Sequence, residues 1–348
     1  MNNLLKRLSP FAPDLSGAVS VLYELGGLTV ICDAGGCTGN ICGFDEPRWF
    51  HKKSAIFSAG LRDIDAILGR DDKLIEKLQD AASKTNVDFT TLVGTPVPAV
   101  IATDFKALKR MAEKRTGLPS ITIETTGTRY YDEGAEQAYL ELFKTFSVEQ
   151  LPVKKGSAGV IGATPLDFSN LEAEKNITVY LENRGWKNTT CYGMGSGLEF
   201  IKKASAVEKN IVVSPSGLKA AEYLKEKFGT PYITNIIPIP ESLQKELYEL
   251  KGKKILIIHQ QVAANSVRDL ILKKTEADIT VASWFMLKES LMQEHDFRLT
   301  EEDQLKGILE SGDYDVVIGD EIFRRVMKKY NGRFIDFPHF AVSGRLEK

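Results

Sequence analysis

Short apolar runs alternate with amphipathic stretches along the chain, and this alternation constrains the fold more than any other feature. Runs rich in β-branched residues, expected as strands, recur at 28–32, 88–94, 120–125, 158–162, 210–214, 254–259, 278–283 and 313–319. Amphipathic stretches, expected as helices, lie between them at 71–84, 104–117, 133–146 and 217–229. Strands separated by helices pair in parallel through right-handed crossovers. The sequence therefore predicts an α/β protein built from Rossmann-like parallel sheets.

Two stretches containing Pro or clustered Lys divide the 348 residues. LPVKKGS at 151–157 and ELKGKK at 249–254 each precede a fresh strand. A chain of this length suffices for two or three domains. We expect consecutive Rossmann-like units over 15–150, 151–250 and 251–348. Because ligands bind beyond the carboxyl ends of parallel strands, four loops are candidate sites: the loop after 28–32, GTPVP at 94–98, ETTGTRYY at 124–131 and GATPLDF at 162–168.

Charge and hydropathy exclude two classes of partner. The net charge is −2, so there is no global basic field to attract nucleic acid or an anionic membrane surface. Nowhere do about 18 apolar residues run consecutively, and the N-terminus lacks the apolar core of a signal peptide. We expect a cytoplasmic protein without a nucleic-acid or membrane partner.

Three of the four cysteines fall within eleven residues. Cys32 closes a predicted strand, and Cys37 and Cys42 follow at equal intervals in a glycine-rich loop that includes Gly35 and Gly36. Thiolates that converge on a small volume hold iron–sulfur clusters, and glycines let backbone N–H groups approach the sulfides. The pattern predicts a cluster, most simply of the [4Fe–4S] type, on Cys32, Cys37 and Cys42, with Gly35 and Gly36 lining it.

Three thiols leave a fourth iron without a ligand from this loop. Cys191, Asp33, a second chain or an exogenous group are the alternatives for that ligand. Zinc is a competing metal, but structural zinc sites show paired cysteine knuckles and the second pair is absent. The remaining interpretation is unligated thiols near a strand end, since free cysteine is a common core residue.

The chain resembles the nitrogenase component 1 family, which includes the related tetrapyrrole reductases. Gly17-Ala18 opens a helix as in that family, and the turn from Cys32 to Cys37 resembles its cluster-binding turn, with Cys37 matching the family's cluster cysteine. Three further segments, 57–78, 92–108 and 123–138, resemble family segments. Two positions depart from the pattern: Pro13-Asp14 and Thr95 stand where classical members supply other cluster cysteines.

The resemblance implies an oxidoreductase subunit that accepts electrons from an ATP-dependent iron protein and passes them to a substrate or second cofactor. It also implies a homodimer, or a heterodimer with a related subunit. The chain has no G-x-x-x-x-G-K-[ST] sequence, so ATP hydrolysis is expected from the partner. Two alternatives remain: a non-catalytic scaffold that carries a metallocluster, and a cluster-free tandem-Rossmann binding protein.

Overall fold

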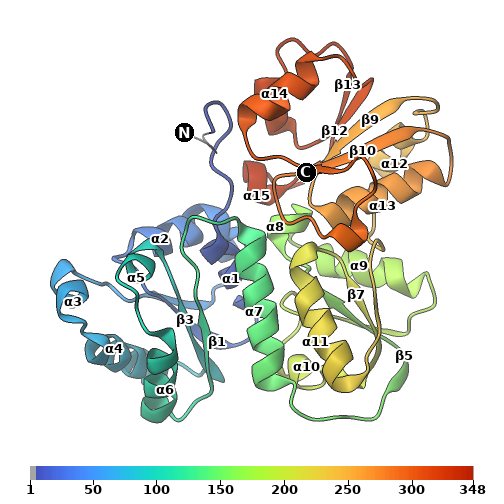
Figure 1. Ribbon diagram of the computed structural model, residues 1–348. Helices are drawn as coiled ribbons and strands as arrows, with labels where there is room; N and C mark the ends of the chain where they lie inside the picture. Colours follow the sequence, from blue (N-terminus) through green and yellow to red (C-terminus); the bar gives the residue numbers. More distant parts are fainter. Residues whose placement is uncertain (1–4, 348) are drawn as a thin grey trace.

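The computed structural model describes residues 5–347 and contains three parallel sheets, one in each of three successive parts of the chain (Figure 1). The sheets use residues 27–123, 154–233 and 254–336. The predicted α/β class is confirmed, and all eight predicted strands are present. The unit boundaries near 151 and 251 stay a prediction. No helix in the part of the chain that the structure describes is long and apolar enough to cross a bilayer.

The first sheet has four parallel strands and is covered by helices on both faces. Its strands, in spatial order, are β2 (Ala55–Ser58), β1 (Gly27–Ile31), β3 (Phe89–Val93) and β4 (Ser120–Ile123). The helices α4 (Asp71–Lys84) and α6 (Phe105–Thr116) pack on one face, and α1 (Asp14–Leu22) and α7 (Tyr131–Phe146) pack on the other. The remaining short elements are α2 (Gly36–Asn40), the π-helical turn η1 (Ile41–Asp45), η2 (Pro47–Phe50), α3 (Asp63–Leu68) and α5 (Pro96–Val100).

The second sheet also has four parallel strands. They are β6 (Asn188–Cys191), β5 (Lys154–Ile161), β7 (Val207–Val212) and β8 (Tyr232–Ile233), in spatial order. Its helical elements are α8 (Pro165–Phe168), α9 (Ala173–Glu182), α10 (Leu198–Lys202), η3 (Ala204–Ala206), η4 (Pro215–Gly217) and α11 (Leu218–Phe228). One apolar core includes residues of the first sheet, α1, α7, α10 and α11, so α1 and α7 lie between the first two sheets.

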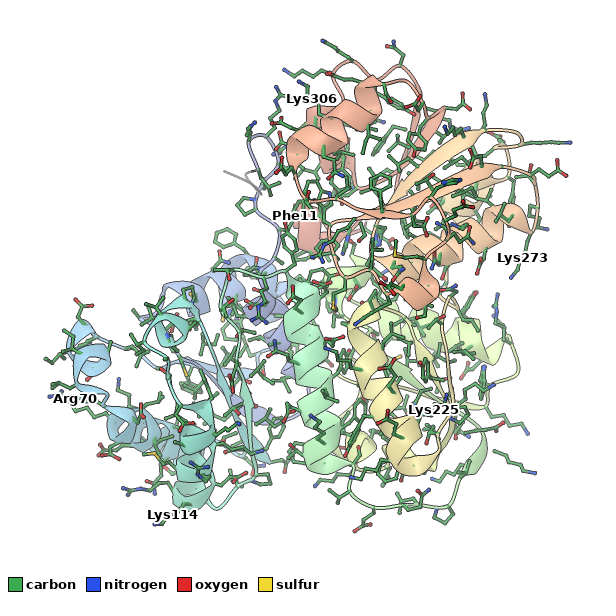
Figure 2. The ribbon with its side chains drawn as sticks, in the orientation of Figure 1. Phe11, Arg70, Lys114, Lys225, Lys273 and Lys306 are labelled. Atoms are coloured by element: carbon green, nitrogen blue, oxygen red, sulfur yellow. The ribbon has the colours of Figure 1, made fainter. Side chains whose placement is uncertain are left out.

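The third sheet has five parallel strands. They are β11 (Phe297–Arg298), β10 (Asp278–Ser283), β9 (Lys254–Ile258), β12 (Val316–Gly319) and β13 (Arg333–Asp336). Its helical elements are α12 (Glu241–Leu247), α13 (Gln261–Leu272), η5 (Glu289–Leu291), α14 (Glu302–Glu310), η6 (Glu321–Val326) and α15 (Phe340–Ser343). Phe11, labelled in Figure 2, joins the N-terminal segment to this third part. The centre of its ring lies 5.6 Å from that of Trp284 and 5.9 Å from that of Phe285.

Local signals place the helix ends where the sequence predicts them. The helix α4 spans residues 71–84 as expected. The Asp104 carboxylate accepts a hydrogen bond from the Ala107 N–H at 2.9 Å and so caps α6, which ends at Gly117 with φ 71°. Burial of an apolar stripe then fixes each helix on its sheet.

Two glycines permit the close crossing of α1 and α7. A Cβ atom on Gly17 would lie 1.8 Å from the Tyr131 carbonyl oxygen, and one on Gly134 would lie 1.8 Å from that of Asp14. Backbone atoms block both positions, so no side-chain rotation relieves the clash. Only glycine fits where the two helices cross.

The variant Gly17→Ala should lose about 3 kcal/mol of unfolding free energy, the upper part of the usual range for overpacking, because α1 and α7 must separate. The control is Gly307→Ala in α14, where an added Cβ meets no atom within 4 Å. That control should gain up to about 1 kcal/mol from its higher helix propensity. Urea unfolding measures both changes, and equal stabilities for the two variants would contradict the close crossing.

Candidate metal centre

The cysteine loop begins at the carboxyl end of β1, the edge at which α/β sheets bind ligands. Cys32 directly follows β1, and Gly35, with φ 120°, turns the chain into α2. Gly36 opens α2, and the helix continues into η1, whose Glu46 N–H donates to the Ile41 carbonyl five residues earlier at 2.9 Å. Such π-helical turns are frequent at functional sites. The loop is therefore a short, continuous helical segment that begins after Gly35 on the sheet edge.

Buried hydrogen bonds hold the loop in place. The Asp33 carboxylate accepts from the backbone N–H and hydroxyl of Thr38, at 2.8 and 3.0 Å, and from the Ser58 hydroxyl at 2.6 Å. The Thr95 hydroxyl donates to the Cys32 carbonyl at 2.7 Å. Thr95 therefore supports the loop through a hydrogen bond.

Cys32 lies on a different face of the first sheet from the other two loop cysteines. Its side chain is 1% exposed and belongs to the core under α4 and α6, together with Leu28 and Val30. Side chains alternate along a strand, and Ile31 accordingly points to the opposite core. Burial raises the pKa of the Cys32 thiol to about 12.

Cys37 and Cys42 are half-buried and both contact the core formed with α1 and α7. Burial raises the pKa of each thiol above its ordinary value. A Cβ placed on Gly36, Gly39 or Gly43 would meet no atom within 4 Å, so open space borders the helical turns that carry these thiols. Two thiols are thus available at one exposed edge.

A three-thiolate site is not assembled within one chain. Among residues 5–347, no three His, Cys, Asp or Glu side chains are placed to hold a metal ion. The set of Cys32, Cys37 and Cys42 therefore stays a prediction, as does the lining role of Gly35 and Gly36. Cys191, the alternative fourth ligand, is 4% exposed at the end of β6, and its thiol faces the Glu174 carbonyl at 3.9 Å.

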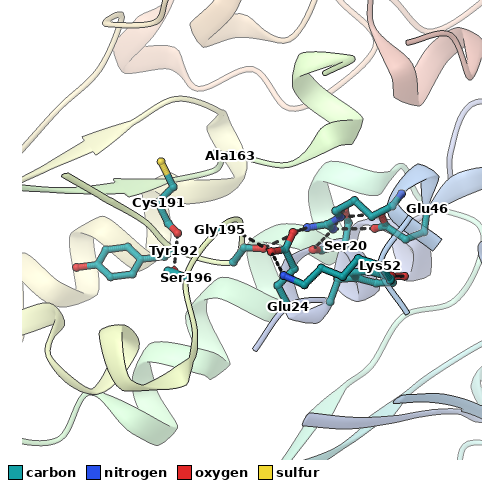
Figure 3. Close-up of polar contacts among 12 residues, drawn as sticks. Ser20, Glu24, Glu46, Lys52, Ala163, Cys191, Tyr192, Gly195 and Ser196 are labelled. Atoms are coloured by element: carbon teal, nitrogen blue, oxygen red, sulfur yellow. Dashed lines mark hydrogen bonds and ion pairs between the residues drawn. The ribbon is translucent and has the colours of Figure 1, made fainter. Parts of the chain in front are cut away.

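Arg48 anchors the segment after the cysteine loop, and sequence reasoning did not predict its burial. It is 4% exposed, and its guanidinium contacts Glu46 at 2.7 Å and Glu24 at 3.0 Å. It also donates to the carbonyls of Ser20 at 2.6 Å and Gly193 at 3.3 Å. Figure 3 shows this ion cluster around Glu24 and Glu46, with the Cys191 sulfur directed away from it. The cluster ties the cysteine segment to α1 and to the second unit.

A second group of buried titratable side chains lies where the second and third units meet. The Tyr131 hydroxyl contacts the Asp167 carboxylate at 2.8 Å and His339 Nε2 at 2.9 Å. His339 stacks on His259 with ring centres 4.2 Å apart. The 162–168 loop was a candidate from its position after a strand, but the sequence holds no signal that these four side chains converge.

Burial changes the ionisation of this group. It raises the pKa of the Asp167 carboxyl to about 7, and it lowers the pKa of His259 to about 4. Burial, with the neighbouring His259, lowers the pKa of His339 below its ordinary value. Both histidines are therefore neutral near pH 7, and Asp167 titrates there.

The Asp167→Asn variant should become progressively more stable than the parent between about pH 4 and pH 7. An aspartate whose pKa is raised by folding holds its proton in the folded state, so the parent loses stability as the pH rises through this window. The gain should level off above pH 7 at no more than about 4 kcal/mol. The lowered pKa of His259 changes stability with pH in the opposite direction, but both proteins keep this histidine. Its effect therefore cancels in the difference between their unfolding free energies. Thermal unfolding between pH 4 and pH 8.5 measures the stability difference between the two proteins. A difference that does not change with pH would contradict the assigned ionisation of Asp167.

The fold is that of a chain of three parallel-sheet units with a thiol-bearing loop at the edge of the first. A family model, "Nitrogenase component 1 type Oxidoreductase", matches residues 14–244, about two thirds of the chain. The protein belongs to the nitrogenase component 1 type oxidoreductase family, as the sequence resemblance predicted.

Individual relatives are distant. The chain is 23% identical over 227 residues to one subunit of the light-independent protochlorophyllide reductase of Nostoc punctiforme, covering 62% of this chain and 44% of that protein. It thus spans less than half of that relative's length. A solved structure described as "Nitrogenase Cp1 at pH 6.5" superposes with a TM-score of 0.70 at 11% identity, covering 96% of this chain and 86% of the other. A second solved structure, described as "Nitrogenase Cp1 at pH 5", superposes with a TM-score of 0.63 at 15% identity, covering 98% of this chain and 78% of the other. These superpositions establish the shared fold.

Proposed function

We propose that this chain is an iron–sulfur reductase subunit in which two copies meet at the cysteine loop and share one [4Fe–4S] cluster. Cys37 and Cys42 of each copy supply its four thiolates. The observation that carries the proposal is the pair of half-buried thiols on the glycine-bounded α2–η1 turns. The family match gives independent support for a redox role.

The residues present fit a shared cluster better than a cluster within one chain. Cys37 and Cys42 contact the same core, whereas the Cys32 sulfur lies on the other face of the sheet. One chain therefore offers two thiols at this edge, and a two-fold axis through it doubles the number to the four that a [4Fe–4S] cluster takes. Cys32 is assigned to the core of the first unit in this proposal.

Exposed apolar side chains of the first unit support a second copy as the occupant of this surface. Nine of the fifteen exposed large hydrophobic side chains among the described residues come from positions 44–101, which run from the end of the cysteine loop to the end of α5. They are Phe44, Phe50, Phe57, Ile64, Ile67, Leu68, Val97, Val100 and Ile101. Clustered apolar residues on a surface mark interaction sites. Figure 1 shows α3, which carries Ile64, Ile67 and Leu68, at the outer (left) end of the first unit and α2 at its upper end.

When bound, the cluster would accept and release single electrons. The chain's own residues hold the two thiols: Asp33 and Thr95 fix the loop, and Arg48 fixes the segment that follows. The electron donor in this proposal is an ATP-dependent iron protein, because the sequence lacks a phosphate-binding P-loop. The acceptor is a small molecule bound elsewhere in the chain.

The test is reduction of anaerobically purified protein by an ATP-dependent iron protein, followed by absorbance. Bleaching that needs both the iron protein and MgATP supports the reductase role. Bleaching by dithionite alone, with release of the cluster to an apo-acceptor, would indicate a scaffold. A colourless, iron-free protein would indicate the cluster-free binding protein.

A further inference from the structure

A cavity of about 320 Å³ lies between the second and third units, within the size range of small-molecule sites. Its walls are largely apolar, with Phe168, Ile237, Ile239 and Phe337 among them. Loops that follow β5, β9 and β13 contribute to it, so it occupies the carboxyl edges of both sheets. The cavity is suited to a compact molecule with an apolar body.

The charged residues in the wall are all acidic. Asp167, Glu241 and Glu347 line the cavity, and no lysine or arginine does so in the described part of the chain. The nearby Arg345 is held by Asp336 at 2.6 Å and by Glu321 at 3.2 Å. An anionic ligand, such as a phosphate ester or a carboxylate, would meet repulsion here without a compensating cation.

Asp167 is the most buried of these carboxyls, at 3% exposure, and no lysine or arginine among residues 5–347 interacts with it. Its hydrogen-bond donors are neutral hydroxyls: Tyr131 at 2.8 Å, Thr164 at 3.0 Å, and Ser214. The other titratable groups around it are Asp132 and Tyr139 from α7, of which Asp132 adds negative charge, and the neutral histidines His259 and His339. A buried carboxylate without a countercharge is costly, so the position favours a cation from outside the chain.

His259 adds an unpaired acceptor atom to the wall. It lines the cavity and is 3% exposed, and its Nε2–H donates to the Pro338 carbonyl at 3.2 Å. Since a carbonyl only accepts, Nδ1 carries the lone pair, and in the described residues that atom has no hydrogen-bond partner. This buried lone pair is free to accept a hydrogen bond from a donor bound in the cavity.

We propose that this cavity binds a small organic cation, a protonated amine or amidine on an apolar body, with Asp167 as its counter-ion and His259 as a hydrogen-bond acceptor. A divalent metal is disfavoured, because no three His, Cys, Asp or Glu side chains are placed around one point in residues 5–347. The inference rests on the proposed function in one respect: it takes this molecule as the substrate of the reductase. Binding itself requires no cluster.

Calorimetric titration with benzylamine, benzoate and benzyl alcohol tests the charge preference on one ring scaffold. Benzylamine should bind, its affinity should rise about tenfold between pH 6 and pH 8 as Asp167 ionises, and benzoate should not bind. Benzyl alcohol should bind at least tenfold more weakly than benzylamine at pH 8. Equal affinity for benzylamine and benzoate, or no benzylamine binding, would overturn the proposal.

Two variants locate the binding. Asp167→Asn should weaken benzylamine binding at least tenfold at pH 8 and remove its pH dependence. The control is Glu249→Gln, an exposed acidic residue outside this cavity, which should bind benzylamine like the parent. Parent-like binding by Asp167→Asn would overturn the assignment. Iron analysis of the same samples separates the two proposals, because amine binding by iron-free protein contradicts the reductase role alone.

Discussion

Cys37→Ser and Cys42→Ser should each lose most of the bound iron and the absorbance shoulder near ~400 nm expected of thiolate-bound clusters. Each substitution removes two of four thiolates from a cluster shared by two copies, so the effect of one change is doubled. Anaerobic purification, iron and sulfide analysis and an absorption spectrum measure it.

Two further cysteine variants make the result specific. Cys191→Ser, at the end of β6, should retain the iron of the parent, because its thiol lies in the second unit. Cys32→Ala separates the shared-cluster arrangement from the three-thiolate set: retained iron supports ligation by Cys37 and Cys42 alone. Loss of iron in Cys32→Ala, with the fold intact by circular dichroism, would favour the three-thiolate set.

Arg48→Met should lose about 3–5 kcal/mol of unfolding free energy, because Glu46 and Glu24 then stay buried without their cation. The side chains of Glu46 and Glu24 are only 2% and 8% exposed. Denaturant unfolding of the metal-free protein measures this loss of unfolding free energy without a contribution from metal binding.

The matched control for Arg48 is Lys52→Met. Lys52 contacts the same Glu24 carboxylate at 2.8 Å, but its side chain is 62% exposed. Exposed ion pairs contribute at most about 1 kcal/mol, so Lys52→Met should change little. Similar losses of unfolding free energy for the two variants would show that burial does not determine how much each ion pair of this cluster contributes to stability.

The sequence predicts the central strands and long helices because both depend on local patterns. The stretches 254–259 and 313–319 contain the continuous apolar runs 255–258 and 316–318, and they form β9 and β12 in the interior of the third sheet. The missed strands are mostly short and peripheral. β2 and β6 are four-residue edge strands of mixed burial, and they lack the apolar run that marks a central parallel strand.

The site was predicted less completely, since its parts meet only through tertiary packing. The position of Cys37 and Cys42 at a strand edge follows from the glycine-rich spacing after β1. The separation of Cys32 follows from strand alternation, which the spacing of cysteines does not encode. Asp167, Tyr131, His259 and His339 come from four separate segments, so their convergence needed the structure.

Iron and acid-labile sulfide per chain, measured with the sedimentation mass of the same anaerobic sample, test whether two copies share one cluster. We expect a dimer with about four irons and four sulfides for every two chains. A monomer that holds a full cluster, or a dimer that holds no iron after anaerobic reconstitution, would contradict it.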